Sequence, residues 1–232
     1  MGTHNDQERV KNWFDTTYKT KGYRYLRPKS SYKCFITALD IQKGKKFLDV
    51  ACGPGLMLKV AEENGLKPHG VDITPTGVEM ARELVKTAVV QEANAEQLPF
   101  ENDTFDYITC LGSLERMINL EQVLKEQLRV IAPDGKFCFM VRNSNTLLWN
   151  IKRMFKLENH EGHQGAKSLS EWTATFEKAG FHVEDVKKDS WPWIKWVRWM
   201  TGGIFLDYYK LRNTPIPLKN TFEFIFIMTK KK

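Results

Sequence analysis

Cysteine is scarce in this sequence, and no two cysteines are closely spaced. The four residues are Cys34, Cys52, Cys110 and Cys138, so no Cys-x-x-Cys motif is present. A disulfide framework or a zinc site is therefore not expected, and no metal is predicted. The same scarcity favours a reducing compartment, and we predict a cytoplasmic location.

Long apolar runs are also missing. No stretch approaches the roughly 20 residues that a membrane-spanning helix needs, and the first ten residues are too polar for a signal peptide. At 232 residues the chain is long enough to bury a sizeable core, and we expect one domain over residues 1–232.

Acidic residues are few in the last part of the chain. From Lys187 to Lys232 there are ten Lys or Arg and three Asp or Glu, which accounts for the whole net charge of +7. A basic region of this kind suits an anionic membrane surface, a nucleic acid or an acidic substrate. A solvated surface with a basic tail explains the same composition equally well.

The third glycine of a dinucleotide-binding motif is absent. Residues 47–51 predict a buried strand, and Gly53, Pro54 and Gly55 form a turn that leads into a helix. Such a turn lets a ligand lie against the backbone N–H groups at the start of the helix. A dinucleotide motif would have its third glycine at position 58, which is Leu58. The spacing therefore disfavours a dinucleotide cofactor.

The same turn resembles motif I of the class I S-adenosylmethionine (SAM)-dependent methyltransferases. It reads Asp49-x-Ala51-x-Gly53-x-Gly55, with Ala51 where the family often has its first glycine. The resemblance extends over about residues 30–190 and a closing strand near 221–229. Within this family, the chain is similar to the small-molecule methyltransferases of the ubiquinone and menaquinone type.

Two later blocks carry the same resemblance. Residues 67–74 look like a second strand that ends in Asp72, where an acidic side chain can accept bonds from both ribose hydroxyls. Residues 92–100 and 103–109 are similar to the D-A-x-x-L-P-F and F-D-x-V block of the family. Asn94 replaces the usual aspartate there, and its amide oxygen can still accept a bond from the adenine amino group.

The resemblance implies SAM as the cofactor and S-adenosylhomocysteine (SAH) as its product. Most of the implied binding residues fall in the three blocks or directly after the fourth strand, and Tyr18 or Tyr25 is expected near the SAM carboxylate. The full set is Tyr18, Tyr25, Asp49, Ala51, Cys52, Gly53, Pro54, Gly55, Asp72, Ile73, Asn94, Ala95, Glu96, Cys110, Leu111 and Gly112.

Predicted strands and helices alternate along most of the chain. Strands are predicted at 46–51, 67–72, 88–92, 104–110, 135–142, 181–186 and 222–228, and helices at 29–41, 55–64, 75–86, 119–131 and 168–180. This predicts an α/β fold: a Rossmann-like, doubly wound, seven-stranded, mostly parallel sheet with helices on both faces and a C-terminal antiparallel strand. Ligands in such sheets bind beyond the carboxyl ends of the strands, where the loops with the residues above would meet.

The N-terminal segment, residues 1–41, is predicted to form helices and a lid over the cofactor. Residues 5–28 contain five aromatic side chains among charges, which is too aromatic for a disordered tail. Packing of these rings onto the domain, without a role in binding, is an equally good interpretation.

Residues 110–117 follow the fourth strand and face the expected acceptor. Many relatives have a histidine where this chain has Arg116, which stays protonated and cannot accept a proton. Arg116 could instead hold a carboxylate or phosphate of the substrate. Glu115 and His163 are then the candidate catalytic bases. The alternatives are that Glu115 and Arg116 position the next helix and that His163 is solvated.

A Trp-rich insert, residues 191–220, precedes the last strand. If residues 191–205 are helical, Trp193 and Trp196 share one side, opposite Lys195 and Arg198. This composition is typical of helices at a membrane interface, but a cap over an apolar pocket is the favoured interpretation. Both interpretations favour a lipophilic acceptor, and Trp193 and Trp196 are predicted substrate contacts.

We therefore hypothesise a methyltransferase that acts on a small, lipophilic acceptor, lipid-like or quinone-like, with O-methylation favoured. The insert at 191–205 predicts a peripheral contact with a membrane. An RNA methyltransferase is an alternative, disfavoured because no RNA-binding module is recognisable. A SAM-binding regulatory protein without catalysis is another, and the sequence indicates no oligomeric state.

Overall fold

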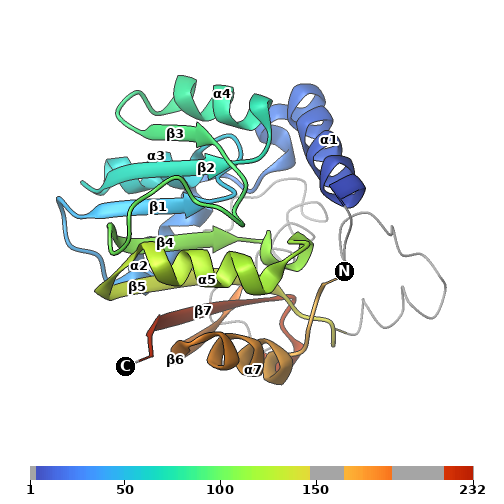
Figure 1. The fold of residues 1–232 in the computed structure, drawn as a ribbon, viewed down its shortest axis with the longest axis vertical. Helices are drawn as coiled ribbons and strands as arrows, with labels where there is room; N and C mark the ends of the chain where they lie inside the picture. The colour runs from blue at the N-terminus through green and yellow to red at the C-terminus, as the bar shows by residue number, and fades with distance from the viewer. Residues whose placement is uncertain (1–3, 147–164, 190–216, 232) are drawn as a thin grey trace, which may run out of the picture.

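The computed structural model describes residues 4–146, 165–189 and 217–231. Within them, seven strands form one sheet in the order β3-β2-β1-β4-β5-β7-β6 (Figure 1). The strands are β1 (Lys46–Val50), β2 (Lys67–Asp72), β3 (Val89–Glu92), β4 (Phe105–Leu111), β5 (Ile131–Arg142), β6 (Phe181–Asp189) and β7 (Glu223–Lys230). Strands from β3 to β5 run parallel, whereas β7 is antiparallel to both β5 and β6. The predicted sheet is confirmed.

Helices cover both faces of the sheet. The described α-helices are α1 (His4–Lys21), α2 (Lys33–Leu39), α3 (Leu56–Glu63), α4 (Pro75–Leu84), α5 (Leu120–Val130) and α7 (Leu169–Ala179). Side chains of α5 and α7 pack in one hydrophobic cluster, and those of α2, α3 and α4 pack in another. Figure 1 shows α5 and α7 on the near side of the sheet, with α2 behind it.

The two clusters follow from the alternation of side chains along each strand. In β5, Phe137 and Phe139 belong to the cluster under α5 and α7, and Cys138 and Met140 belong to the other. Because successive side chains of a strand point to opposite faces, a continuous apolar run fills both cores. This is why β5 is apolar without interruption over residues 137–141 and β7 over residues 224–228.

Helix α7 begins and ends at the residues that the sequence predicts. Ser168 forms a capping box with Glu171, and the helix ends at Gly180, which has φ +105°. Trp172 stacks on Phe176 with 5.4 Å between the ring centroids, and both side chains are fully buried. The capped helix therefore places its aromatic side chains directly on the sheet.

Several predicted boundaries were wrong, and the strand predicted at 181–186 extends to Asp189. The helix predicted at 29–41 is a 3₁₀ helix at Lys29–Tyr32 (η2) followed by α2, because both the backbone N–H and the hydroxyl of Ser31 donate to the carbonyl of Pro28. The strand predicted to begin at 135 begins at Ile131. Ile131 pairs with Phe105, and the register then shifts, so the pairing spans an irregularity.

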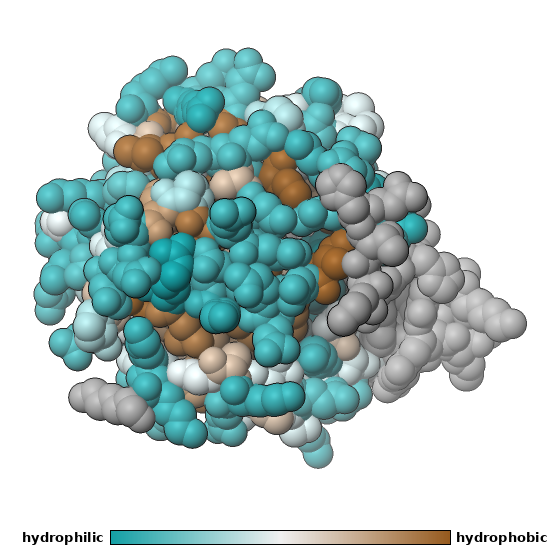
Figure 2. Space-filling view, viewed as in Figure 1, coloured by the Kyte–Doolittle hydropathy of each residue, from teal (hydrophilic) through white to brown (hydrophobic). Residues whose placement is uncertain are grey.

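Most of the Trp-rich insert, residues 190–216, lies outside the described residues. In the part of the chain that is described, none of the helices has the length and apolar character needed to cross a membrane. The face shown in Figure 2 is mainly hydrophilic, with hydrophobic residues in separate small groups.

We expect the Phe176→Ala variant to lower the free energy of unfolding by about 3–5 kcal/mol, because it empties a fully buried site. The ring lies 5.0 Å from that of Phe226 and 5.9 Å from that of Phe181, so α7 would lose its main contact with β6 and β7. Urea denaturation measures the change. Val89→Ala is the control, since Val89 is 49% exposed and should lose less than about 1 kcal/mol. Equal losses in the two variants would contradict this account of the core.

Candidate cofactor and acceptor site

The turn after β1 has the backbone of a ligand-binding loop. Ala51, Gly53 and Gly55 all have positive φ, at 60°, 47° and 82°. A Cβ on Gly55 would lie 2.8 Å from the Cβ of Ala81, so this glycine allows α3 and α4 to pack closely. Ala51 adopts a left-handed conformation that suits glycine better, which gives a physical reason for the family's usual glycine at this place.

Asp72 ties this turn to the end of β2. One carboxylate oxygen accepts the Gly53 N–H at 2.7 Å, and the other accepts the Thr74 N–H at 2.9 Å and the Thr74 hydroxyl at 2.6 Å. The side chain is buried, and this burial raises its pKa although the bonds from Thr74 and Gly53 act in the opposite direction. Three donors thus hold the carboxylate in one orientation beside the turn.

Asn94 lies in the loop after β3. Its side-chain oxygen accepts the Glu96 N–H at 3.0 Å, which closes a local turn. A carbonyl oxygen has two lone pairs, so this bond leaves one for a further donor. The loop thus brings Asn94, Ala95 and Glu96 to the same edge of the sheet as Asp72.

These loops line a first cavity of about 80 Å³. The predicted residues among its walls are Tyr18, Ala51, Asp72, Ile73, Asn94, Ala95, Glu96 and Arg116. Apart from Asp72, Glu96 and Arg116, these wall residues are uncharged. A mainly uncharged wall with the carboxylate of Asp72 held in place suits a nucleoside, whose base is flat and whose ribose offers two hydroxyl donors.

A second, larger cavity of about 290 Å³ adjoins the first. Phe14, Tyr18, Ala51, Ser113 and Arg116 line both cavities, so the two share one wall. The predicted residues that line the second cavity are Tyr18, Tyr25, Asp49, Ala51, Cys52, Gly53, Leu111, Gly112 and Arg116. A molecule in the first cavity can therefore meet another in the second.

Asp49 is the penultimate residue of β1 and lines the second cavity. Burial raises the pKa of its carboxyl to about 7, although the Thr109 hydroxyl donates a bond of 2.6 Å to it. The negative charge of Asp72 also raises the pKa of Asp49, by less than burial does. Near neutral pH this carboxyl is therefore only partly ionised.

Helix α1 lies across the open edge of the site. Its Asp15 accepts the backbone N–H of Thr76 in the first turn of α4 at 2.9 Å, and its Lys11 pairs with Glu92 at 2.8 Å. Tyr18 is buried over the turn, and burial holds its pKa well above the usual value, so the phenol stays neutral. The α1 rings thus pack against one another and also form cavity walls.

The remaining predicted residues divide into two groups. Pro54, Gly55, Cys110 and Glu115 are buried and are not among the wall residues of either cavity. His163, Trp193 and Trp196 lie outside the described residues. In the described ranges 4–146, 165–189 and 217–231, no group of three or more His, Cys, Asp or Glu is placed to hold a metal ion.

Several wall residues were missed by the sequence analysis. In the second cavity they are Phe14, Leu26, Arg27, Tyr32, Met57, Met140, Arg142 and Glu223. The rule that ligands lie beyond the carboxyl ends of strands could have indicated Arg142, since it ends β5. Arg27 and Glu223 come from segments far apart in the sequence, and no local pattern marks them.

Comparison with known proteins supports the resemblance seen in the sequence. Residues 48–139 match the family model for a methyltransferase domain. The chain thus contains a methyltransferase domain and is similar to the class I SAM-dependent methyltransferases. A putative methyltransferase from Bacillus halodurans shares the fold, with a TM-score of 0.64 and 16% identity over 88% of this chain and 100% of that one. A phosphoethanolamine N-methyltransferase from Haemonchus contortus does so with a TM-score of 0.70 and 18% identity over 96% and 60%.

Curated relatives of this chain match over part of their length. An uncharacterized protein of Methanocaldococcus jannaschii is 34% identical over 157 residues, which are 67% of this chain and 58% of that protein. A demethylmenaquinone methyltransferase of Bacillus mycoides is 28% identical over 153 residues, 62% and 64% respectively. A sterol 4-C-methyltransferase of Caenorhabditis elegans is 33% identical over 127 residues, 51% and 38%. The chain thus spans about three fifths of the length of the first two relatives.

The residues of the first cavity, together with the turn after β1 that lines the second, fit the cofactor of this family. Gly53 leaves bare backbone at the turn, since a Cβ there would lie only 2.7 Å from the Tyr18 hydroxyl. The carboxylate of Asp72 can accept further hydrogen bonds beside that turn, and the amide oxygen of Asn94 can do so in the loop after β3.

We expect Gly53→Ala to weaken SAH binding by tenfold or more in a calorimetric titration. The added methyl group would displace Tyr18 from a wall that both cavities share. Gly44→Ala is a matched control, because Gly44 also has positive φ, +81°, but no atom lies within 4 Å of its added Cβ. The Gly44→Ala variant has the same kind of backbone strain, but its added methyl group collides with no other residue, so its affinity for SAH should be unchanged. A similar loss in both variants would show that strain alone weakens binding.

The buried Asp49 predicts a pH dependence of stability. Its pKa of about 7 in the folded protein exceeds the value near 4 of an unfolded aspartate, so its contribution is favourable below pH 4 and is lost as the pH rises to 7. The Asp49→Asn variant keeps an acceptor for Thr109 but has no proton to release. Between pH 4 and 7, its free energy of unfolding should fall less than that of the wild type, by up to about 4 kcal/mol. Urea denaturation across this range tests the prediction, and parallel curves would contradict it.

Proposed function

We propose that this protein transfers the methyl group of SAM to a small, lipophilic acceptor bound in the second cavity, with a hydroxyl oxygen as the favoured acceptor atom. The observation that carries the proposal is the shared wall of the two cavities, which brings a second molecule next to a bound nucleoside. Two relatives support the acceptor class, since their names state a menaquinone precursor and a sterol.

The proposed cofactor contacts lie in the first cavity and in the adjoining part of the second, and the acceptor would occupy the rest of the second cavity. Asp72 would accept hydrogen bonds from the ribose hydroxyls, and the amide oxygen of Asn94 would accept one from the adenine amino group. Tyr18 or Tyr25 would lie near the methionine carboxylate. The walls would come from Ala51, Cys52, Gly53, Ile73, Ala95, Glu96, Leu111 and Gly112, with Pro54, Gly55 and Cys110 supporting them from behind. Bound SAM supplies an electrophilic methyl group on a sulfonium.

The protein's own contribution would be mainly orientation and the exclusion of water. Holding an acceptor in line with the methyl group can account for a large part of the rate. A hydroxyl acceptor must also lose its proton, for which His163 and Glu115 are the proposed bases. We further propose that Arg116, Trp193 and Trp196 contact the acceptor.

The location of the protein is part of the same proposal. A cytoplasmic enzyme with a lipophilic acceptor benefits from peripheral contact with a membrane, and the basic residues and tryptophans of 191–205 suit such a contact.

Incubation with SAM labelled in its methyl group, together with separated lipid, small-molecule and RNA fractions, tests the function. We expect label in the lipid or small-molecule fraction, and the Gly53→Ala variant should transfer much less. Label in RNA would overturn the acceptor class and support the alternative suggested by the basic C-terminal region. No label in any fraction, from a protein that binds SAH, would support a regulatory role instead.

A further inference from the structure

Five described residues line both cavities, so they surround the place where the two cavities join. They are Phe14, Tyr18, Ala51, Ser113 and Arg116. In the proposed mode of binding, the nucleoside occupies the first cavity and the methionine part of SAM continues into the second. The sulfur atom of SAM links these two parts. The shared wall is therefore next to the sulfonium and to the methyl group that it carries.

Three of these five side chains are polar, and two of the three are engaged by the protein. The Ser113 hydroxyl donates to the Leu111 carbonyl at 3.4 Å. The Arg116 guanidinium donates to the Gly112 carbonyl. Among the described residues, by contrast, the Tyr18 hydroxyl has no hydrogen-bond partner. Its oxygen is thus available to a ligand at the junction.

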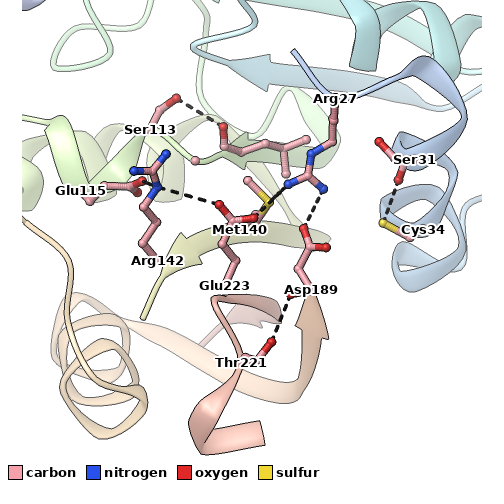
Figure 3. A network of polar contacts seen from close by, with 12 residues as sticks. Arg27, Ser31, Cys34, Ser113, Glu115, Met140, Arg142, Asp189, Thr221 and Glu223 are labelled. Carbon is pink, nitrogen blue, oxygen red and sulfur yellow. Dashed lines mark hydrogen bonds and ion pairs between the residues drawn. The ribbon is translucent and has the colours of Figure 1, made fainter. Parts of the chain in front are cut away.

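The charged groups further along the second cavity bind one another. Figure 3 shows Arg27 and Arg142 on either side of Glu223. Arg27 lies 2.6 Å from Asp189 and 3.0 Å from Glu223, and Arg142 lies 3.3 Å from Glu115. These residues do not belong to the wall of the first cavity. They are therefore not the groups that meet the sulfonium.

Contacts of α1 fix the position of Tyr18. Asp15, three residues earlier in the helix, accepts the Thr76 N–H at 2.9 Å and so joins α1 to α4. The Tyr18 ring lies 5.9 Å from the Phe14 ring, and the residue is only 8% exposed. Its oxygen is close to the turn after β1, since a Cβ on Gly53 would lie 2.7 Å from it. The hydroxyl is thus held over the loop that we assign to SAM.

The phenol stays neutral in this position. Burial raises the pKa of Tyr18 well above its usual value, and the negative charge of Asp72 raises it further. A neutral phenol is a weak nucleophile, so it does not compete with the acceptor for the methyl group. Its oxygen keeps the lone pairs of a hydrogen-bond acceptor, which attract a positively charged group.

We propose that the Tyr18 hydroxyl lies against the methyl sulfonium of bound SAM, where its oxygen favours the positively charged cofactor over the neutral sulfur of SAH. This inference rests on the proposed function and assigns a group at its reacting centre. In the transfer, the C–S bond breaks as the C–O bond forms, SAH leaves with the electron pair, and the acceptor's proton goes to a base. Tyr18 keeps its own proton. Tyr25 is then the residue left for the methionine carboxylate.

Calorimetric titration of the full chain with SAH and with sinefungin tests the proposal. Sinefungin has the same nucleoside and amino-acid ends, but it carries an ammonium group on carbon where SAM carries the methyl sulfonium. We expect Tyr18→Phe to weaken the binding of sinefungin about tenfold or more, the effect of a hydrogen bond to a charged group. Its affinity for SAH should stay within about threefold of the wild type, which also shows that the variant is folded.

Tyr23→Phe is the matched control. Tyr23 belongs to η1 (Gly22–Tyr25), is 41% exposed and is not a wall residue of either cavity, so both affinities should be unchanged. A second measurement, which does not need the Phe variant, uses the chain with 3-fluorotyrosine in place of Tyr18. Its fluorine resonance should have different positions in the complexes with sinefungin and with SAH.

Three results would overturn the assignment of Tyr18. Equal losses for the two ligands in a folded Tyr18→Phe variant would place the hydroxyl on a part that they share, such as the carboxylate. No loss for either ligand, or one fluorine position for both complexes, would remove the hydroxyl from the reacting centre. A wild-type chain that binds neither SAH nor sinefungin would instead overturn the proposed function.

Discussion

The hydrogen bond from the Gly53 N–H to Asp72 is the interaction on which the site depends. Strands β1 and β2 are parallel neighbours, with Val50 opposite Val71, so the turn after one strand meets the end of the other. The bond of 2.7 Å joins them, and the two bonds from Thr74 extend the link to the start of α4. Two loops and one helix are thus held in a fixed relation before any ligand binds, which is the preorganisation that a binding site needs.

This arrangement is unfavourable for stability in itself. Asp49 and Asp72 are both buried, and burial raises the pKa of each carboxyl. Ala51 adds a left-handed backbone conformation at the same turn. The two aromatic cores that α5, α7 and the opposite helices form on the sheet offset these local penalties. Unfavourable groups gathered at one edge, beyond the carboxyl ends of β1 and β2, are typical of a site retained for binding.

The sequence allowed much of this to be predicted. Alternating strands and helices determined the sheet, and the topology rule brought Asp49, Gly53 and Asp72 together, because each is adjacent to the end of its own strand. The ends of some elements were harder to predict. The bonds from Ser31 to the Pro28 carbonyl and the irregular pairing at Ile131 depend on backbone geometry, which a pattern of hydrophobic residues does not show. The acceptor side was least predictable, because Arg27 and Glu223 are 196 residues apart and meet only through the sheet.

The direction of β7 explains why charge gathers on the acceptor side. A parallel strand contributes its last residue to the ligand edge of the sheet, whereas an antiparallel strand contributes its first. Glu223, the first residue of β7, therefore lies opposite Arg142 at the end of β5 and opposite Asp189 at the end of β6. The row Arg142–Glu223–Asp189 crosses three strands, and Arg27 reaches it from the N-terminal segment. The antiparallel strand β7 thus supplies Glu223, the carboxylate that lies between Arg27 and Arg142. A parallel strand in the same place would have its first residue at the opposite edge of the sheet.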